Sequence, residues 1–446
     1  MAAEDLDERT RRQLFAILQY LQSHDLLEAA CALESESGVH YEEGALPEAG
    51  VLEASLDMFA NYRAEAGRGA SDVGRSVEEE LVQVERGVCC TSGLGEAANK
   101  PTLGANVTAV CWVASSCSEM VAVVATADRR LRAMDVEAEV LCELADFSSP
   151  ILNLDAVPCV DTKEGADVRS PAVDQELLAT SMGGETVLLR VCRPTSSGGS
   201  WALEVAQRFK DHAKHVTCGR FAPPAEEGGS CTHFVTASRD HQAMLYERRG
   251  GEFSLAGTVR SVGEVTSCCW ASATTFVLAS RDDHHLRYWD VAGSDGKPAE
   301  RLKTNLNALG DSVVSFTVLA LAVSPDRRLI AVCTDKSRII LLPTFSDVQV
   351  RNLYGAVIDE YDVPSVSFSM DRSFLYATSS LPQKAVPQRG EVGEVLCGEV
   401  VIFEIRTGAV VLKLPCHTKP VRCMDRHPLT EALVTGSFDK TVRFWS

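Results

Sequence analysis

The amino-acid sequence predicts a mainly β chain of repeated strand units that follow a small α-helical region. Two observations carry this prediction. A turn aspartate recurs along the chain with an aromatic or apolar residue six positions later, and apolar residues near the N-terminus follow a helical period. The chain has 446 residues, of which 45% are apolar and 24% charged, so it contains ample material for a buried core.

The turn aspartate marks five clear copies of the repeated unit. A short apolar run, such as HFVTAS, precedes each turn, and a second run, such as VTCGRFAPP, lies ahead of most of them. Once two weaker copies are included, the units recur at spacings of roughly 40 to 70 residues, which indicates one compact group of strands for each unit. The five copies run from Asp128 to Met134, Asp240 to Tyr246, Asp283 to Trp289, Asp335 to Leu341 and Asp439 to Trp445.

Two further units are weaker. LLATSMGGETVLLRV keeps the strand pattern but has Gly184 and Arg190 at the key positions. SVSFSMDRSFLYATSS and GEVVIFEI form the other unit, which an insertion at about 381–398 divides. With these two the chain has seven units, each with three or four short strands.

The seven units resemble the WD-repeat family, whose repeats are the blades of a β-propeller. The resemblance runs from about residue 105 to the end of the sequence. It implies a mainly β fold, a seven-bladed WD-type β-propeller, preceded here by the helical region. It also implies a turn network in which the aspartate bonds to a preceding histidine, a serine or threonine, and a tryptophan.

Blades three and seven offer the most complete sets for this network. Blade three has His212, Thr236 or Ser238, Asp240, and Tyr246 in place of the tryptophan, and blade seven has His417, Ser437, Asp439 and Trp445. The resemblance assigns structural turn or network roles to Asp128, His212, Asp240, Tyr246, Asp283, Trp289, Asp335, His417, Asp439 and Trp445.

The last blade ends at its third strand, which would leave the edge of a sheet exposed. We expect residues 80–92 (ELVQVERGVCCTS) to supply the fourth strand and close the ring. A short charged helix is the alternative structure for this segment.

Residues 10–39 predict two short helices that the residues SHD separate. The two helices expose a continuous apolar stripe, and a segment of about thirty residues is too small to bury it alone. A helical partner is therefore implied. With Ile17, Tyr20, Leu21, Ala30, Leu33 and Glu36 at matching positions, the stretch resembles the LisH motif, a dimerising helix pair. Asp25, Leu26 and Ala29 depart from the motif. The alternative is a helical hairpin packed against the propeller. The resemblance implies a dimerisation seam of Leu14, Ile17, Tyr20, Leu21, Leu26, Ala30 and Leu33.

The chain is therefore expected to have three parts. Residues 8–66 form the LisH helical dimerisation module with a following helix, residues 67–79 form a linker, and residues 80–446 form the propeller.

The formal net charge of −19 argues against nucleic acid or an anionic membrane as a direct partner. We expect a soluble protein of the cytoplasm, with the nucleus as an alternative, because the sequence shows no signal peptide and its 16 cysteines contain no CxxC motif.

We expect no catalytic residue, metal or cofactor. Cys416, His417, Cys423 and His427 could ligate zinc, but the strand pattern of blade seven explains each of them better. The turn that contains Asp283, His284 and His285 has no nucleophile or phosphate loop nearby, so a solvated turn is the preferred interpretation.

The predicted function is a protein-interaction scaffold that dimerises through LisH and binds other proteins or acidic peptides on the propeller face. The alternatives are a receptor or scaffold subunit of a cullin/RING ubiquitin ligase, for which Arg193 and Arg406 are candidate adaptor contacts, and a microtubule/dynein-linked or corepressor adaptor. Residues beside the turn aspartates are the candidate partner-binding set, and five of the six are basic: Arg129, Arg239, Arg281, Asp282, Lys336 and Lys440.

The seam predicts how the chain assembles. Burying one such side chain against a partner contributes roughly 1.5–3 kcal/mol, and an unpaired carboxylate there would cost more than this. Leu21→Glu should therefore convert a dimer into a folded monomer, while Gln22→Glu should not change the mass that light scattering measures. A wild-type monomer at micromolar concentration would contradict the homodimer.

Overall fold

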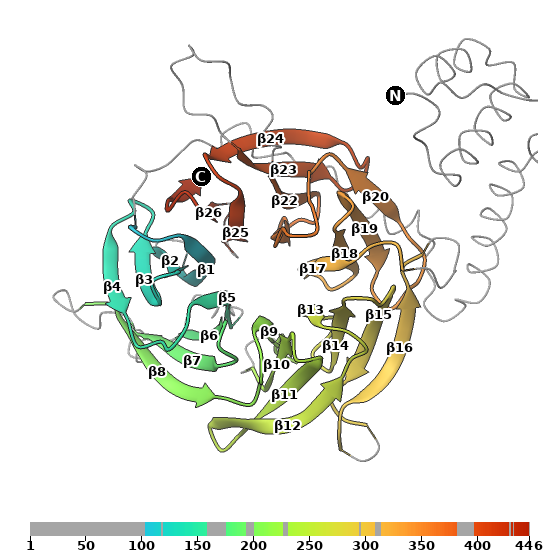
Figure 1. Ribbon diagram of the computed structural model, residues 1–446, viewed down its shortest axis with the longest axis horizontal. Coiled ribbons are helices and arrows are strands. Elements are labelled where there is room, and N and C mark those ends of the chain that lie inside the picture. The colour runs from blue at the N-terminus through green and yellow to red at the C-terminus, as the bar shows by residue number, and fades with distance from the viewer. Residues whose placement is uncertain are drawn as a thin grey trace, which may run out of the picture. The chain divides into compact units, whose positions relative to one another are not determined.

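Seven antiparallel sheets make up the computed structural model over residues 103–116, 119–157, 175–192, 200–225, 231–293, 296–307, 314–380, 397–427, 430 and 432–445. They are arranged as blades around a central channel (Figure 1). These residues contain no helix, and hence none that is long and apolar enough to cross a membrane. The predicted seven-bladed, mainly β propeller is confirmed. The LisH module, its seam, the linker and residues 80–92 lie outside the described residues.

In each blade the strands lie in chain order from the channel outward. Blades one and two contain β1 (Val107–Ser116), β2 (Glu119–Thr126), β3 (Arg130–Asp135), β4 (Val140–Leu144), β5 (Ile151–Ala156), β6 (Gln175–Ser181), β7 (Thr186–Cys192) and β8 (Ala202–Phe209). Blades three and four contain β9 (Val216–Phe221), β10 (His233–Ser238), β11 (Gln242–Arg249), β12 (Glu252–Arg260), β13 (Val265–Trp270), β14 (Thr275–Ser280), β15 (His285–Asp290) and β16 (Ala299–Asn305).

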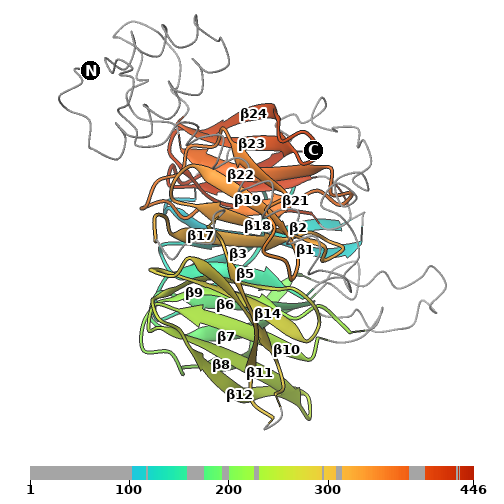
Figure 2. The same cartoon turned by 90° about the vertical axis from the view of Figure 1, so that its right-hand side faces the viewer.

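The remaining three blades complete the ring, which Figure 2 shows from its side. Blades five and six contain β17 (Val318–Val323), β18 (Leu329–Thr334), β19 (Arg338–Pro343), β20 (Arg351–Tyr354), β21 (Val366–Phe368), β22 (Phe374–Ser380), β23 (Gly398–Glu404) and β24 (Val410–His417). Blade seven contains β25 (Val421–Arg426), β26 (Leu433–Ser437) and β27 (Val442–Trp445). The inner strand of each blade packs beside those of its two neighbours, and β25 packs beside β1.

The second strands of the blades are largely apolar and buried, as TFVLAS in β14 and LIAVCT in β18 illustrate. Such strands need cover on both faces, and the neighbouring blades supply it. Buried clusters therefore run from blade to blade, for example from Phe234 and Tyr246 in blade three to Trp270 and Phe276 in blade four.

The inner strands are sheet edges, so their backbone groups need partners in the next blade. Polar side chains supply them. Asp155 accepts a hydrogen bond from the Phe221 amide at 2.8 Å, and Asp425 accepts one from the Trp112 amide at 2.7 Å. The indole of Trp112 donates in turn to the Asp425 carbonyl at 3.2 Å. Acidic and aromatic residues of the channel thus join one blade to the next.

The turn network of blade seven is fully formed. His417 Nδ1 lies 3.0 Å from Asp439 Oδ2, and Nε2 lies 2.9 Å from Thr435 Oγ1. The Trp445 indole donates to Thr435 Oγ1 at 3.1 Å. The hydroxyl is therefore that of Thr435 and not Ser437, because Ser437 lies at the strand end and accepts from the Asp439 amide instead.

Blade three holds the same core of contacts. His212 lies 2.9 Å from both Asp240 Oδ2 and Thr236 Oγ1, so Thr236 and not Ser238 supplies the hydroxyl. Tyr246 departs from the expected pattern, because its phenol donates to Asp211 Oδ2 at 2.8 Å. The network here lacks the bond that a tryptophan would donate.

The other turn aspartates are held in different ways. Asp128 bonds to the Thr126 hydroxyl and to Arg132, and Asp335 accepts from the Thr317 amide at 2.9 Å. In blade four the Trp289 indole nitrogen has no hydrogen-bond partner among the described residues. The turn aspartate is thus common to these blades, while the partners around it are not.

One contact beside blade seven bears on the closing strand. The Leu103 amide donates to the Lys440 carbonyl at 3.0 Å. In blades three and four, the residue that follows the outer strand makes the equivalent bond, from Ser261 to His241 and from Leu306 to His284. Leu103 thus occupies the position that follows the outer strand in those two blades, while the expected closing strand itself lies outside the described residues.

The closing strand predicts how truncation affects the ring. A chain that starts at residue 105 should melt at a lower temperature than one that starts at residue 78, and should aggregate through the open edge of β27. The chain from residue 78 should be monodisperse in size-exclusion chromatography. Equal melting temperatures would contradict the closing strand.

The network of blade seven predicts acid sensitivity. Burial raises the pKa of Asp439, but hydrogen bonds from His417 and Thr441 outweigh it and hold that pKa well below its usual range. A lowered folded-state pKa gives stability that is present above about pH 4 and is lost as the pH falls below it. Asp439→Ala should lower the free energy of unfolding at pH 7 by about 2 kcal/mol in urea titrations, and by less at pH 3. The control Glu137→Ala, in an exposed turn, should change the free energy of unfolding by under about 0.5 kcal/mol. If Asp439→Ala also lowers the free energy of unfolding at pH 7 by less than about 0.5 kcal/mol, the network does not stabilise the fold.

Candidate functional site

One face of the ring carries the turns between the second and third strands and the loops that enter the inner strands. In blades one to five, the residue after the second strand donates its amide to a carbonyl of the entering loop, as from Arg239 to His215 (3.0 Å) and from Arg281 to Glu264 (2.8 Å). These bonds fix turn and loop together around the channel. We call this surface the turn face.

The inner strands are irregular where they start at this face. The ladder shifts register at their second residue, so that this residue is left out of the pairing. Such bulges redirect side chains, and five of the six released residues line one cavity at the mouth of the channel. The released residues are Thr108, Leu152, Thr217, Thr266, Leu319 and Arg422.

This cavity, the mouth pocket, has a volume of about 570 Å³. Charged side chains from two parts of the ring contribute to its lining. Three arginines come from blades three, four and seven, and an acidic segment comes from the loop between blades five and six. Its lining residues are Leu152, His215, Thr217, Arg239, Glu264, Val265, Thr266, Arg281, Leu319, Glu360, Tyr361, Asp362, Val363 and Arg422.

The arginines of the mouth pocket have few partners. Arg239 Nε and Arg281 Nε share a single carboxylate oxygen of Glu264, at 4.0 and 3.9 Å. Both distances are too long for a hydrogen bond. The Arg281 Nε group is buried and has no hydrogen-bond partner among the described residues. Arg422 donates one long bond, of 3.4 Å, to the Val363 carbonyl.

Backbone geometry holds two of these groups side by side. A Cβ atom at Gly263 would lie 1.9 Å from the Arg281 carbonyl oxygen, so only glycine permits this approach of loop and turn. The approach places Glu264 beside the turn that carries Arg281. Sequence analysis did not single out this glycine.

The structure divides the six predicted binding residues. Arg239 and Arg281 precede the turn aspartate and line the mouth pocket. The other four do not line it. Arg129 and Lys440 directly follow the turn aspartate, and Asp282 lies between Arg281 and the turn aspartate of blade four. All three residues have φ between 61° and 70°, and their side chains are exposed. Lys336 lies 3.5 Å from Asp335.

Sequence reasoning missed Arg422 and Tyr361. Arg422 is the second residue of β25, a position that is released from the ladder in other blades as well. Tyr361 follows Asp359 and Glu360 in a tight turn, and 86% of its surface is exposed. A signal was present, because an aromatic residue within a run of acids is unusual for a solvated loop.

The channel below the mouth has a volume of about 430 Å³ and its own charged residues. Burial raises the pKa of Asp155 to about 7, although Arg220 lies 3.6 Å away and opposes the shift. Cys218 and Cys268 approach to 3.3 Å between their sulfur atoms, and the hydrogen bond from Cys268 lowers the pKa of Cys218 below its ordinary value. These groups bond to neighbouring blades, which gives them structural roles.

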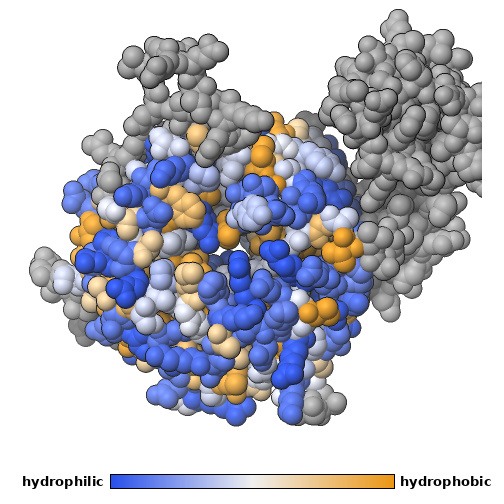
Figure 3. Space-filling view, in the orientation of Figure 1, coloured by the Kyte–Doolittle hydropathy of each residue, from blue (hydrophilic) through white to orange (hydrophobic). Residues whose placement is uncertain are grey.

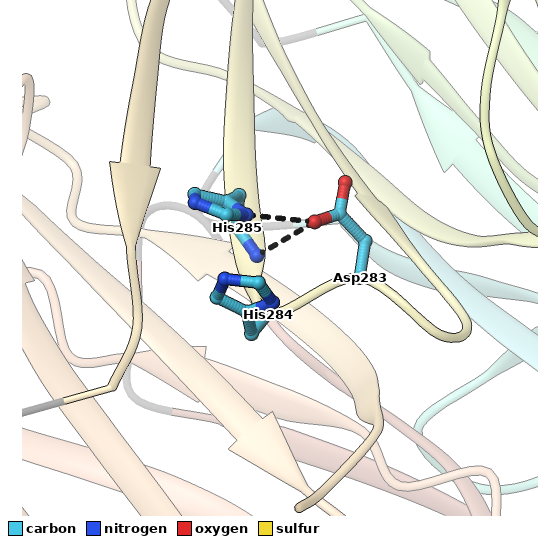
Figure 4. A group of neighbouring side chains, drawn as sticks. All are labelled: Asp283, His284 and His285. Atoms are coloured by element: carbon cyan, nitrogen blue, oxygen red, sulfur yellow. Dashed lines mark hydrogen bonds and ion pairs between the residues drawn. The ribbon is translucent and has the colours of Figure 1, made fainter. Parts of the chain in front are cut away.

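One group of potential metal ligands occurs in the described part of the chain, at Asp283, His284 and His285 (Figure 4). Asp283 Oδ1 accepts from the His285 amide at 3.1 Å and lies 2.9 Å from the His285 ring. Arg287 Nε donates to the other oxygen at 2.8 Å. A guanidinium on the same carboxylate disfavours a second cation there, so the geometry is that of a capped turn.

The possible zinc ligands of blade seven do not form such a group. His417 belongs to the turn network, Cys416 and Cys423 are buried, and the His427 ring lies edge-on to Trp112 at 5.2 Å. Of the two candidate ligase contacts, Arg193 lies outside the described residues. Arg406 is exposed in the turn between β23 and β24, on the face opposite the turn face.

Figure 3 shows one face of the ring, where hydrophilic side chains surround the central opening and apolar ones form small separate patches. Neither these patches nor the clusters above assemble a nucleophile with a base and an orienting group in the described residues. The arginine-lined mouth pocket is therefore the best-formed candidate for binding.

Comparison with known proteins agrees with the fold. Residues 254–290 and 408–446 match the family "WD domain, G-beta repeat". A 98-residue stretch is 28% identical to WD repeat-containing protein 1 of Xenopus tropicalis, and this stretch is 22% of the chain and 15% of that relative. The chain thus spans a small part of the curated relative that it matches. It is a seven-bladed β-propeller in which two segments carry recognisable WD repeats.

Proposed function

We propose that this protein is a non-catalytic scaffold that binds partner proteins at the mouth pocket of its propeller. The matched WD repeat family and the propeller fold support a role in protein interaction. The observation that supports the location best is the set of three arginines, Arg239, Arg281 and Arg422, whose side chains together donate one hydrogen bond, from Arg422, within the described part of the chain.

Arginines that hold strands together within the blades use their donors on nearby acids. Arg287 bonds to Asp283 and Glu300, and Arg132 bonds to Glu143, Thr126 and Asp128. A guanidinium offers five N–H groups that match the oxygens of a carboxylate or phosphate. We therefore propose an acidic segment of a partner protein as the occupant of the pocket.

Dimerisation through the LisH seam is part of the proposal. Two propellers in one dimer would offer two mouth pockets, so a partner with two acidic segments would bind with a higher apparent affinity than either pocket provides. The ligase and adaptor roles remain predictions from sequence resemblance, and Arg406 alone represents them in the described residues.

Affinity purification from cells tests this function. The full chain should recover a set of partners of which some are lost with the double variant Arg239→Ala, Arg281→Ala. The control Arg129→Ala, Lys440→Ala removes the same two positive charges from the turn face but outside the pocket, and should keep the set intact. Mass spectrometry of the lost partners separates the alternatives, since cullin adaptors, dynein subunits and chromatin deacetylases are each diagnostic. Identical partner sets for the wild type and the double variant would overturn the mouth pocket as the binding site.

A further inference from the structure

We propose that the mouth pocket recognises a phosphorylated serine or threonine side chain of the partner, with an apolar residue beside it. This inference rests on the proposed function, because it specifies the acidic group that enters the same pocket. It depends on the number of unused guanidinium groups, on the acid already present, and on the exposed residues at the rim.

Three arginines and three acids line the pocket, and within the described residues none of these acids accepts a hydrogen bond from these arginines. Arg239 and Arg281 face one carboxylate, Glu264, and neither approaches it closely enough to donate a hydrogen bond. Arg422 makes no ion pair within 4 Å in the part of the chain described. Burial lowers the pKa of Arg422, which means that its charged form is held there at a cost.

The acidic side of the pocket, in contrast, is already occupied by internal bonds. Asp362 Oδ2 accepts from the Asp359 amide at 3.0 Å, and Oδ1 accepts from the Ser380 hydroxyl at 3.2 Å. Glu360 is exposed to solvent. Asp362 therefore accepts hydrogen bonds from within the protein, and Glu360 is hydrated. The groups of the pocket that could still bond to a ligand are the guanidinium donors, which require acceptor oxygens.

A phosphate meets this demand better than a carboxylate does. A phosphoserine or phosphothreonine carries about −1.5 to −2 charges at pH 7 and three acceptor oxygens. It can bond to two or three guanidinium groups at once, and it can compete with Glu264 for Arg239 and Arg281. A partner carboxylate would bring only one negative charge, the same as Glu264 already supplies.

Apolar surface lies next to the arginines. Tyr361 and Val363 line the pocket and are 86% and 48% exposed, and Val262, in the loop that leads to Glu264, is 69% exposed. Exposed apolar residues in one place beside a polar pocket are typical of an interaction surface. They suit an apolar residue adjacent to the phosphorylated one.

Degenerate peptide libraries on the full chain test the inference without knowledge of the partner. Three libraries share random flanking positions and carry phosphoserine, serine or glutamate at a fixed central position. The phosphoserine library should be retained at least about tenfold more than the other two, which corresponds to about 1.4 kcal/mol, because the phosphate makes charge-assisted hydrogen bonds that serine lacks and carries more charge than glutamate. Apolar residues should be enriched next to the phosphoserine. Equal retention of all three libraries would overturn the inference.

Variants and phosphatase treatment separate this inference from the proposed function. Arg281→Ala and Arg422→Ala should each reduce retention about tenfold, while Arg129→Ala should leave it unchanged. Partners that depend on Arg239 and Arg281 in cell extracts should be lost after phosphatase treatment of the extract. If those partners are kept after treatment, or if the glutamate library is retained as well as the phosphoserine library, the phosphate inference fails and the binding site stands. Loss of phosphoserine retention with Arg129→Ala to the same degree would also refute it, since the attraction would then be a general effect of charge.

Discussion

The fold depends on one constraint, which is that the inner strand of every blade is the edge of a sheet and faces a channel. Its backbone groups must bond across to the next blade, and residues such as Asp155, Asp425 and Trp112 make these bonds. The hydrogen-bonding groups of these channel side chains are therefore occupied in holding neighbouring blades together. At the turn face the inner strands contain bulges, so their second residues do not pair with the next strand. The mouth pocket arises at that position.

The arginines inside the blades differ from those at the mouth of the channel. Within the blades, arginines such as Arg132 and Arg287 are paired with acids and hold strands together. At the mouth, Arg239, Arg281 and Arg422 lie on three different blades and share little with their surroundings. A charged side chain stabilises the fold when its hydrogen bonds are made within the protein, whereas one that binds a ligand must keep its donors available for that ligand. This difference, more than the sum of charge on the surface, distinguishes the pocket.

Sequence patterns predicted the seven strand units and the turn aspartates, because both depend on local spacing. They also placed Arg239 and Arg281 beside the turns that line the pocket. Arg422 could not be found in this way, since a bulge is a property of pairing between strands and leaves no local signal. The hydroxyl of blade seven was assigned to Ser437 although Thr435 provides it, because two residues of one strand share a face and only packing depth separates them. Tyr246 likewise fits the tryptophan position in spacing, but its phenol reaches Asp211 instead.

The central claim is that partners bind at the mouth pocket, and site-directed photo-crosslinking tests it most directly. A photoreactive phenylalanine analogue at position 361, at the rim of the pocket, is compared with the same analogue at position 354, where Tyr354 is 61% exposed on the outer strand β20. The account predicts that the partners that require Arg239 and Arg281 crosslink from position 361 and not from position 354. Crosslinks from position 354 alone would contradict it.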